Sequence, residues 1–149
     1  MISKTKPVCK VDTDGSKRWY LNGKLHREDG PAIEDTNGIK AWCINDKLHR
    51  EDGPAIVYAT GGKRWYINGK RHREDGPAVE NADGSKVWYL NGELHREDGP
   101  AVEYANGAKV WYLNGEPYTP SAHEVIIYKM KYEFQRTHER RMGLLQKKS

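Results

Sequence analysis

The string His-Arg-Glu-Asp-Gly-Pro-Ala occurs four times, and it contains the residue types best suited to chemistry in this chain. Its copies begin at His26, His49, His72 and His95. Imidazole, guanidinium and carboxylate groups could together serve acid–base catalysis, metal binding or anion binding. An enzyme needs one site with differentiated roles, whereas four identical copies mark what every unit of a repeat requires structurally. The clusters therefore predict a protein that is not an enzyme and that holds no cofactor.

The charged side chains of each cluster have a structural explanation. Arg27 can pair with a Glu or Asp of its own or the next unit, and Asp29 suits a turn in which its side chain accepts backbone N–H bonds. His26 is expected across a strand pair from Trp19, packed against its ring. One histidine per unit with no cysteine partner does not favour a metal site. A repeated notch for a small ligand remains an open alternative.

The clusters recur every 23 residues, and other features of the sequence keep the same register. The same step separates five tryptophans and five asparagines: Trp19, Trp42, Trp65, Trp88 and Trp111, with Asn22, Asn45, Asn68, Asn91 and Asn114. This register indicates a tandem-repeat array of about four and a half units. We assign residues 1–120 to the array and residues 121–149 to a basic C-terminal helix and tail.

Turn signals within each unit predict how the array folds. Asn22-Gly23 and three further Asn-Gly pairs favour type I′ hairpins, which would pair Trp19-Tyr20-Leu21 with Lys24-Leu25-His26. The second unit has Asn45-Asp46 at this turn instead, a poorer fit. A glycine-containing turn after each unit returns the chain to the next Trp strand. The sequence thus predicts a mainly β fold, a single-layer antiparallel meander of 23-residue hairpin repeats with a C-terminal capping helix.

The composition agrees with a thin, sheet-rich molecule. Apolar residues make up 36% of the 149 residues, and the mean hydropathy is −0.95, so a thick core is not expected. No apolar run approaches the roughly 18 residues of a membrane span, and the N-terminus lacks the apolar stretch of a signal peptide. Cys9 and Cys43 provide neither a disulfide framework nor a zinc spacing. These features predict a cytoplasmic protein.

The C-terminal segment has the signature of a basic helix. Ser121 with Glu124 three residues later is a capping box, and we expect a helix from about Ala122 to about Met142 that covers the open last edge of the sheet. Residues 121–149 hold seven Lys and Arg and three Glu, which leaves 18 basic and 18 acidic residues in the array. The tail could therefore touch nucleic acid or dock a protein. Its candidate residues are Lys129, Lys131, Arg136, Arg140 and Arg141.

The repeat resembles MORN repeats, which are arrays of β-hairpins. Tyr20, Gly23 and His26 match the spacing of the aromatic, glycine and histidine positions in that motif, and the third and fourth units do the same. The variant with His-Arg-Glu-Asp-Gly-Pro-Ala is similar to repeats of phage and giant-virus proteins. The resemblance implies protein scaffolding, and in some MORN arrays lipid binding. This chain departs from the motif by lacking Tyr-x-Gly before the core and by replacing His-Gly-x-Gly.

Positions where the repeats differ predict where a partner binds. Arg64 and Arg71 stand where other units carry Ala or Val and Leu, and alternation along a strand places both with Tyr66 and Arg73. Arginine and tyrosine dominate interface hot spots. We therefore predict a binding or scaffold protein whose Tyr66 face meets an acidic protein partner or an anionic ligand.

Three more specific functions follow as hypotheses. The resemblance suggests a viral accessory or counter-defence factor acting in the host cytoplasm. A second hypothesis is a sponge that holds nucleotide-like anionic ligands between the repeats. A third is nucleic-acid binding through the basic C-terminal helix.

Overall fold

The array is built on one long antiparallel sheet. The computed structural model describes residues 5–146, with side chains described for residues 5–143. The sheet has eleven strands, ten of them in sequential order with β3 (Lys24–Leu25) pairing beside them. The ten are β1 (Val8–Val11), β2 (Lys17–Leu21), β4 (Ile33–Glu34), β5 (Lys40–Ala41), β8 (Ile56–Val57), β9 (Lys63–Arg64), β12 (Val79–Glu80), β13 (Lys86–Val87), β16 (Val102–Glu103) and β17 (Lys109–Val110). The predicted mainly β meander is confirmed.

The Asn-Gly turns close hairpins as predicted. Asn68 and Gly69 have φ values of 49° and 80°, the left-handed conformation that a type I′ turn requires at both positions. Asn45 and Asp46 adopt the same conformation, with φ values of 51° and 66°, so the weaker signal still forms the turn. The hairpins are β6 (Cys43–Ile44) with β7 (Lys47–Leu48), β10 (Tyr66–Ile67) with β11 (Lys70–Arg71), β14 (Tyr89–Leu90) with β15 (Glu93–Leu94), and β18 (Tyr112–Leu113) with β19 (Glu116–Pro117).

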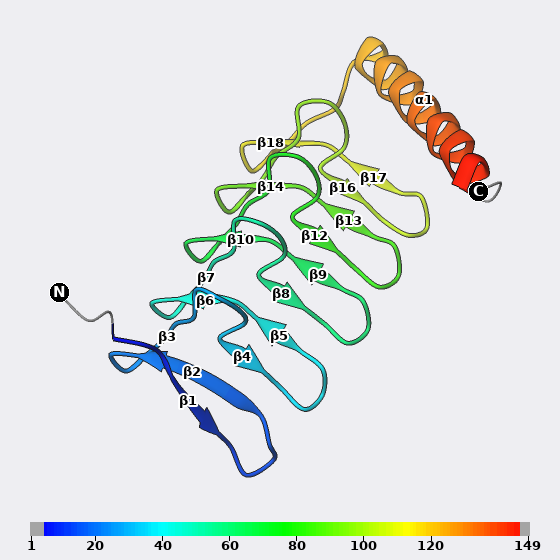
Figure 1. The fold of residues 1–149 in the computed structure, drawn as a ribbon. Helices are drawn as coiled ribbons and strands as arrows, with labels where there is room; N and C mark the ends of the chain where they lie inside the picture. Colours follow the sequence, from blue (N-terminus) through cyan, green and yellow to red (C-terminus); the bar gives the residue numbers. More distant parts are fainter. Residues whose placement is uncertain (1–4, 147–149) are drawn as a thin grey trace.

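The hairpins do not continue the long sheet, which refines the predicted continuous meander. Only β2 runs through its tryptophan; in each later unit the strand is interrupted there. Trp65 N–H donates to the Ala78 carbonyl at 2.8 Å, and the Trp65 carbonyl accepts from His72 N–H at 3.2 Å. These two hydrogen bonds bring the ends of the loop 73–77 together and keep the loop out of the sheet. Its proline has no N–H with which to form sheet hydrogen bonds. The array consequently has two rows, with the hairpins along one side and the long sheet along the other (Figure 1).

Backbone hydrogen bonds join each hairpin to the next. Arg50 N–H donates to the Tyr66 carbonyl at 3.0 Å, and Gly69 N–H donates to the Leu48 carbonyl at 2.8 Å. The same pair of bonds recurs at the other junctions between units. Each unit therefore contacts its neighbours through both rows, as in other repeat arrays in which stability propagates from unit to unit.

Within the long sheet, cross-strand pairing arranges the side chains in a charged row and an apolar row, which are distinct from the two rows of the array itself. Cross-strand partners share a face, and one row alternates in charge: Lys17, Glu34, Lys40, Val57, Lys63, Glu80, Lys86, Glu103 and Lys109. The other row is mainly apolar: Arg18, Ile33, Ala41, Ile56, Arg64, Val79, Val87, Val102 and Val110. Val57 alone breaks the charge alternation.

Replacing Val57 with glutamate should stabilise the protein. Glu34, Glu80 and Glu103 each lie within 3.5 Å of the arginine of their own unit, whereas Arg50 has valine at this position. Val57→Glu would add a carboxylate opposite Lys40 and Lys63 and near Arg50, a gain of about 0.2–1 kcal/mol. Urea unfolding measures the gain, and Val57→Gln controls for shape. Equal stability of the two variants would contradict the electrostatic explanation.

The C-terminal helix starts as predicted and ends later. α1 spans Ala122–Gln146, four residues beyond the expected end at Met142. The capping box is present: Ser121 N–H donates to Glu124 at 2.7 Å, and Glu124 N–H donates to the Ser121 hydroxyl at 3.3 Å. Tyr128 is buried against the last units, while most other helix side chains are exposed. The cap is therefore limited to the first turns of α1.

Within residues 5–146, no helix is long and apolar enough to cross a membrane.

Candidate binding surfaces

The arginine that recurs in the first four units lies in a cage made by its own unit. The Arg73 guanidinium stacks 4.1 Å from the centre of the Trp65 ring. Its Nε donates to Asp75 at 2.8 Å, and its terminal nitrogen contacts the Pro77 carbonyl and Glu80 at 3.2 and 3.1 Å. Arg27, Arg50 and Arg96 stack in the same way at 3.9–4.1 Å. Of the two predicted pairings, with a carboxylate of the same or of the next unit, the structure forms the one within the unit. The main partner of the aspartate is this arginine, and not the backbone N–H groups that the turn was predicted to supply.

This pairing affects the aspartates. The hydrogen bond from Arg27 and the charge of its guanidinium lower the pKa of Asp29 below its ordinary value of 3.8, and Arg50 and Arg73 do the same for Asp52 and Asp75. These carboxylates are solvent-exposed, so each contributes little by itself. Their contribution adds over the units because each pair is separate.

Acid should weaken the fold through these pairs. A carboxylate whose pKa is lower in the folded state stabilises that state above its ordinary pKa, and the contribution is lost as the pH falls below about 4. The triple variant Asp29→Asn, Asp52→Asn, Asp75→Asn should therefore lose less melting temperature than wild type between about pH 5 and pH 3. Thermal unfolding followed by circular dichroism measures the difference. An equal loss of melting temperature in the two proteins over this pH range would contradict this account.

The histidines join neighbouring units. The Nδ1 atoms of His49, His72 and His95 each accept the backbone N–H of the asparagine 19 residues later, at 3.1 Å. Since Nδ1 accepts, the proton of the neutral ring belongs on Nε2, which lies 3.6–3.8 Å from the glutamate two residues on. His26 makes the same contact with Asn45 at 3.3 Å. The histidines therefore have a structural role at every junction.

The loops of residues 26–31 and their copies form a ridge with notches between them. One notch, of about 690 Å³, has Trp42 and Ile44 among its lining residues, together with the Arg27–Gly30 and His49–Asp52 segments of two loops. The next, of about 660 Å³, has Trp65 and Ile67 at the same positions. The ridge glutamates are exposed, Glu51 and Glu74 at 84% of their side-chain area. Because the arginines are paired with aspartates, these carboxylates disfavour an anionic ligand in the notches.

The four residues predicted to form the Tyr66 face are only partly brought together. Arg71 Nε contacts the Tyr66 hydroxyl at 3.2 Å. Arg73 instead stacks on Trp65, and Arg64 lies in the long sheet, 5.3 Å from the Tyr58 ring centre and 2.6 Å from the Asn81 side chain. Simple alternation fails because the chain leaves the sheet at Trp65 and Arg73 follows the bend into the loop. The predicted cluster thus reduces to Arg71 with Tyr66.

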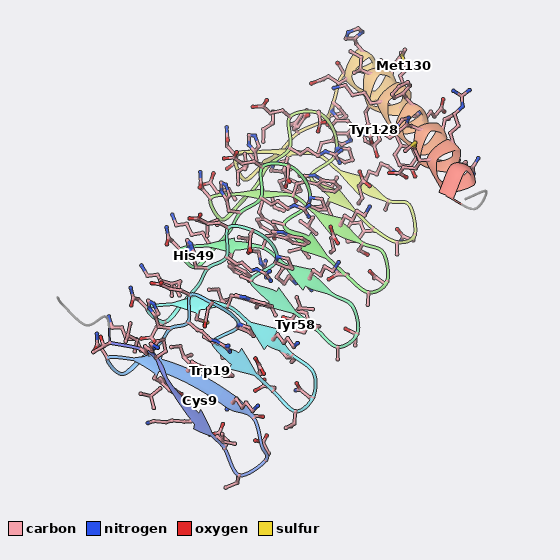
Figure 2. All side chains as sticks on the ribbon, in the orientation of Figure 1. Cys9, Trp19, His49, Tyr58, Tyr128 and Met130 are labelled. Carbon is pink, nitrogen blue, oxygen red and sulfur yellow. The ribbon has the colours of Figure 1, made fainter. Side chains whose placement is uncertain are left out.

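Sequence analysis did not predict two tyrosines, Tyr89 and Tyr128, as site residues. The hydroxyl of Tyr89 in the fourth unit accepts a hydrogen bond from the Arg71 guanidinium of the third unit, at 3.2 Å. Tyr128 of α1 packs edge-on against Trp111 at 5.7 Å and donates to Glu103 at 2.9 Å. The fifth unit has Thr119 where the others have arginine, so Trp111 lacks the usual guanidinium. Figure 2 shows Tyr128 on the side of α1 that faces the array. That missing arginine was the available signal for Tyr128.

The basic residues predicted to form a docking or nucleic-acid surface all lie on α1 and are all exposed. They are Lys129, Lys131, Arg136, Arg140 and Arg141. None forms an ion pair with the described residues of the chain. No protein-family model matches this chain, and no curated protein sequence matches it at a significant level.

Proposed function

We propose that the chain is a non-enzymatic binding protein that presents its hairpin row to an acidic protein partner. The observation that carries the proposal is Arg71, whose guanidinium lies between two tyrosine hydroxyls, those of Tyr66 and Tyr89, each at 3.2 Å. It also lies 5.2 Å from the centre of the Tyr89 ring. Unlike the caged arginines, Arg71 has no carboxylate within 4.0 Å among the described residues.

An acidic side chain of a partner would supply the counter-ion that Arg71 lacks. The hydrogen bond with Tyr66 raises the pKa of Arg71. Arginine is cationic at physiological pH in any case, so the site carries a full positive charge. The three side chains are half-buried and held by one another, which limits the side-chain entropy that binding would cost. Arginine and tyrosine in such a setting are the residues enriched at interface hot spots.

The resemblance to MORN arrays supports a scaffolding role of this kind. Its likeness to the repeats of phage and giant-virus proteins supports a more specific proposal, a viral accessory or counter-defence factor that occupies a host protein. The first rests on motif positions such as Tyr66, Gly69 and His72, and the second on the His-Arg-Glu-Asp-Gly-Pro-Ala string that begins at His72 and recurs in three other units.

Arg71→Leu tests the proposal because it installs the residue found at this position in three other units, Leu25, Leu48 and Leu94. The variant should fold normally and lose partner affinity by about thirtyfold or more, because truncating a hot-spot residue costs about 2 kcal/mol or more. Affinity purification from the native cell with mass spectrometry identifies the partner, and calorimetry with the purified partner measures affinity. Arg64→Val, which installs the residue of the fourth and fifth units, is the matched control. Unchanged affinity in a folded Arg71→Leu variant would overturn the proposed site.

A further inference from the structure

The outward side of α1 carries an apolar stripe that the residues described in the structure leave uncovered. Ile126, Met130 and Phe134 follow one another at four-residue intervals, and Ile127 lies beside them on the same side. Met130 and Phe134 are 65% and 74% exposed. Tyr128 points the other way, toward the array, and Figure 2 shows it and Met130 on opposite sides of the helix. The stripe is thus directed away from the chain's own repeats.

Charge indicates what can cover this stripe. Lys129, Lys131 and Arg140 flank it and are exposed, whereas Glu133 is the one acidic residue beside it. Two such helices packed against each other would bring like charges together, which disfavours a symmetrical helix pair. The surface that covers the stripe should therefore be acidic around an apolar centre.

The ridge of the array has this character. The notch walls carry the exposed carboxylates of Glu28, Glu51 and Glu74, and the notch linings include Trp42, Ile44, Trp65 and Ile67. A helix also fits beside such a notch, because α1 already does so in its own chain. Gln135, His138 and Glu139 line a cavity of about 820 Å³ together with Trp88, Leu90 and the loops of the third and fourth units. The two notches before it are lined by array residues alone.

The spacings of the two surfaces also agree. Each unit adds two strands to the long sheet, a rise of roughly 9.6 Å per notch. Residues seven apart on a helix, such as Ile127 and Phe134, are separated by about 10.5 Å along its axis. Both residues can therefore enter consecutive notches while Lys131, which lies between them in sequence and beside them on the helix, reaches a ridge glutamate.

We propose that the chain associates with itself, the outward stripe of α1 from one copy docking into the two open notches of another. The contact joins different surfaces of the two copies, so it propagates into chains rather than closing as a symmetrical pair of helices. Because the contact is small, we expect a dissociation constant of about micromolar or weaker. It uses neither Arg71 nor Tyr66 and is independent of the function proposed above.

Two variants of the full-length chain separate the contribution of the α1 stripe from that of the ridge. Met130→Ser/Phe134→Ser removes the stripe and keeps the ridge, and Glu51→Lys/Glu74→Lys reverses the ridge and keeps the stripe. Sedimentation equilibrium at low salt should show wild type growing in mass with concentration and each variant alone as a monomer. An equimolar mixture of the two variants should form a one-to-one heterodimer that does not grow further. Circular dichroism confirms that both variants fold, and Arg71→Leu is the control that should assemble like wild type.

The outcomes decide the proposal. A wild type that stays monomeric at about millimolar concentration overturns it. Self-association by the Glu51→Lys/Glu74→Lys variant also overturns it, because the helix would then be pairing with something other than the ridge. A mixture of the two variants that remains monomeric has the same meaning. Formation of the heterodimer, with its loss on addition of about 0.5 M salt, supports the docking of stripe into ridge.

Discussion

Tyr128→Ala should release α1 from the array and abolish most of its helical signal. Tyr128 is 6% exposed, packs against Trp111, lies 5.7 Å from the Arg96 guanidinium and donates to Glu103. Truncating a buried aromatic side chain costs about 3–5 kcal/mol. The rest of the helix has few buried contacts that could hold it in place, and an isolated helix is marginal in water. Circular dichroism at the helical minimum and protease cleavage after residue 120 measure the release.

Two variants show which part of the contact matters. Tyr132→Ala removes a tyrosine from the same helix that is 48% exposed, and it should leave the helical signal nearly unchanged. Tyr128→Phe removes only the hydroxyl and its bond to Glu103, and should cost about 1 kcal/mol. If Tyr128→Ala keeps its full helical signal and resists protease, the anchoring role of Tyr128 is wrong.

The turns of this fold could be predicted because they depend on local chemistry. Asn-Gly pairs favour positive φ wherever they occur, and Ser121 with Glu124 caps a helix without help from the rest of the chain. Because the sequence repeats every 23 residues, the fold predicted for one unit applied to all units. The bend at Trp65 depends instead on two backbone hydrogen bonds to residues on either side of the loop 73–77. Gly76-Pro77 marks the interruption of the returning strand, but no residue type marks the break at the tryptophan.

The candidate site was harder to predict for the same reason. Alternation along one strand placed Arg64, Tyr66, Arg71 and Arg73 together, and the bend at Trp65 separated all but Tyr66 and Arg71. The contact of Arg71 with Tyr89 joins residues 18 apart in different units. On α1, apolar residues occur all around the helix, so the apolar pattern alone could not single out Tyr128, and the remaining signal was Thr119 in place of the arginine that stacks on tryptophan in other units.

Trp65→Ala, in the middle of the array, should destabilise the protein far more than Trp19→Ala at its first unit. Each tryptophan carries the stacked arginine of its own unit, Arg73 on Trp65 and Arg27 on Trp19, at 4.1 Å in both. Removing either ring deletes the same local contact, at a cost of about 3 kcal/mol for a half-buried tryptophan.

The difference arises from the neighbours of each unit. A repeat array is stabilised by interfaces between adjacent units, so losing the third unit uncouples two short segments, whereas losing the first leaves three and a half units in contact. Urea unfolding should therefore show a single transition for Trp19→Ala. Trp65→Ala should show a lower midpoint together with a broader or divided transition. Equal midpoints and equal slopes for the two variants would mean that the array unfolds as one cooperative block, in which the position of a lost tryptophan has no effect.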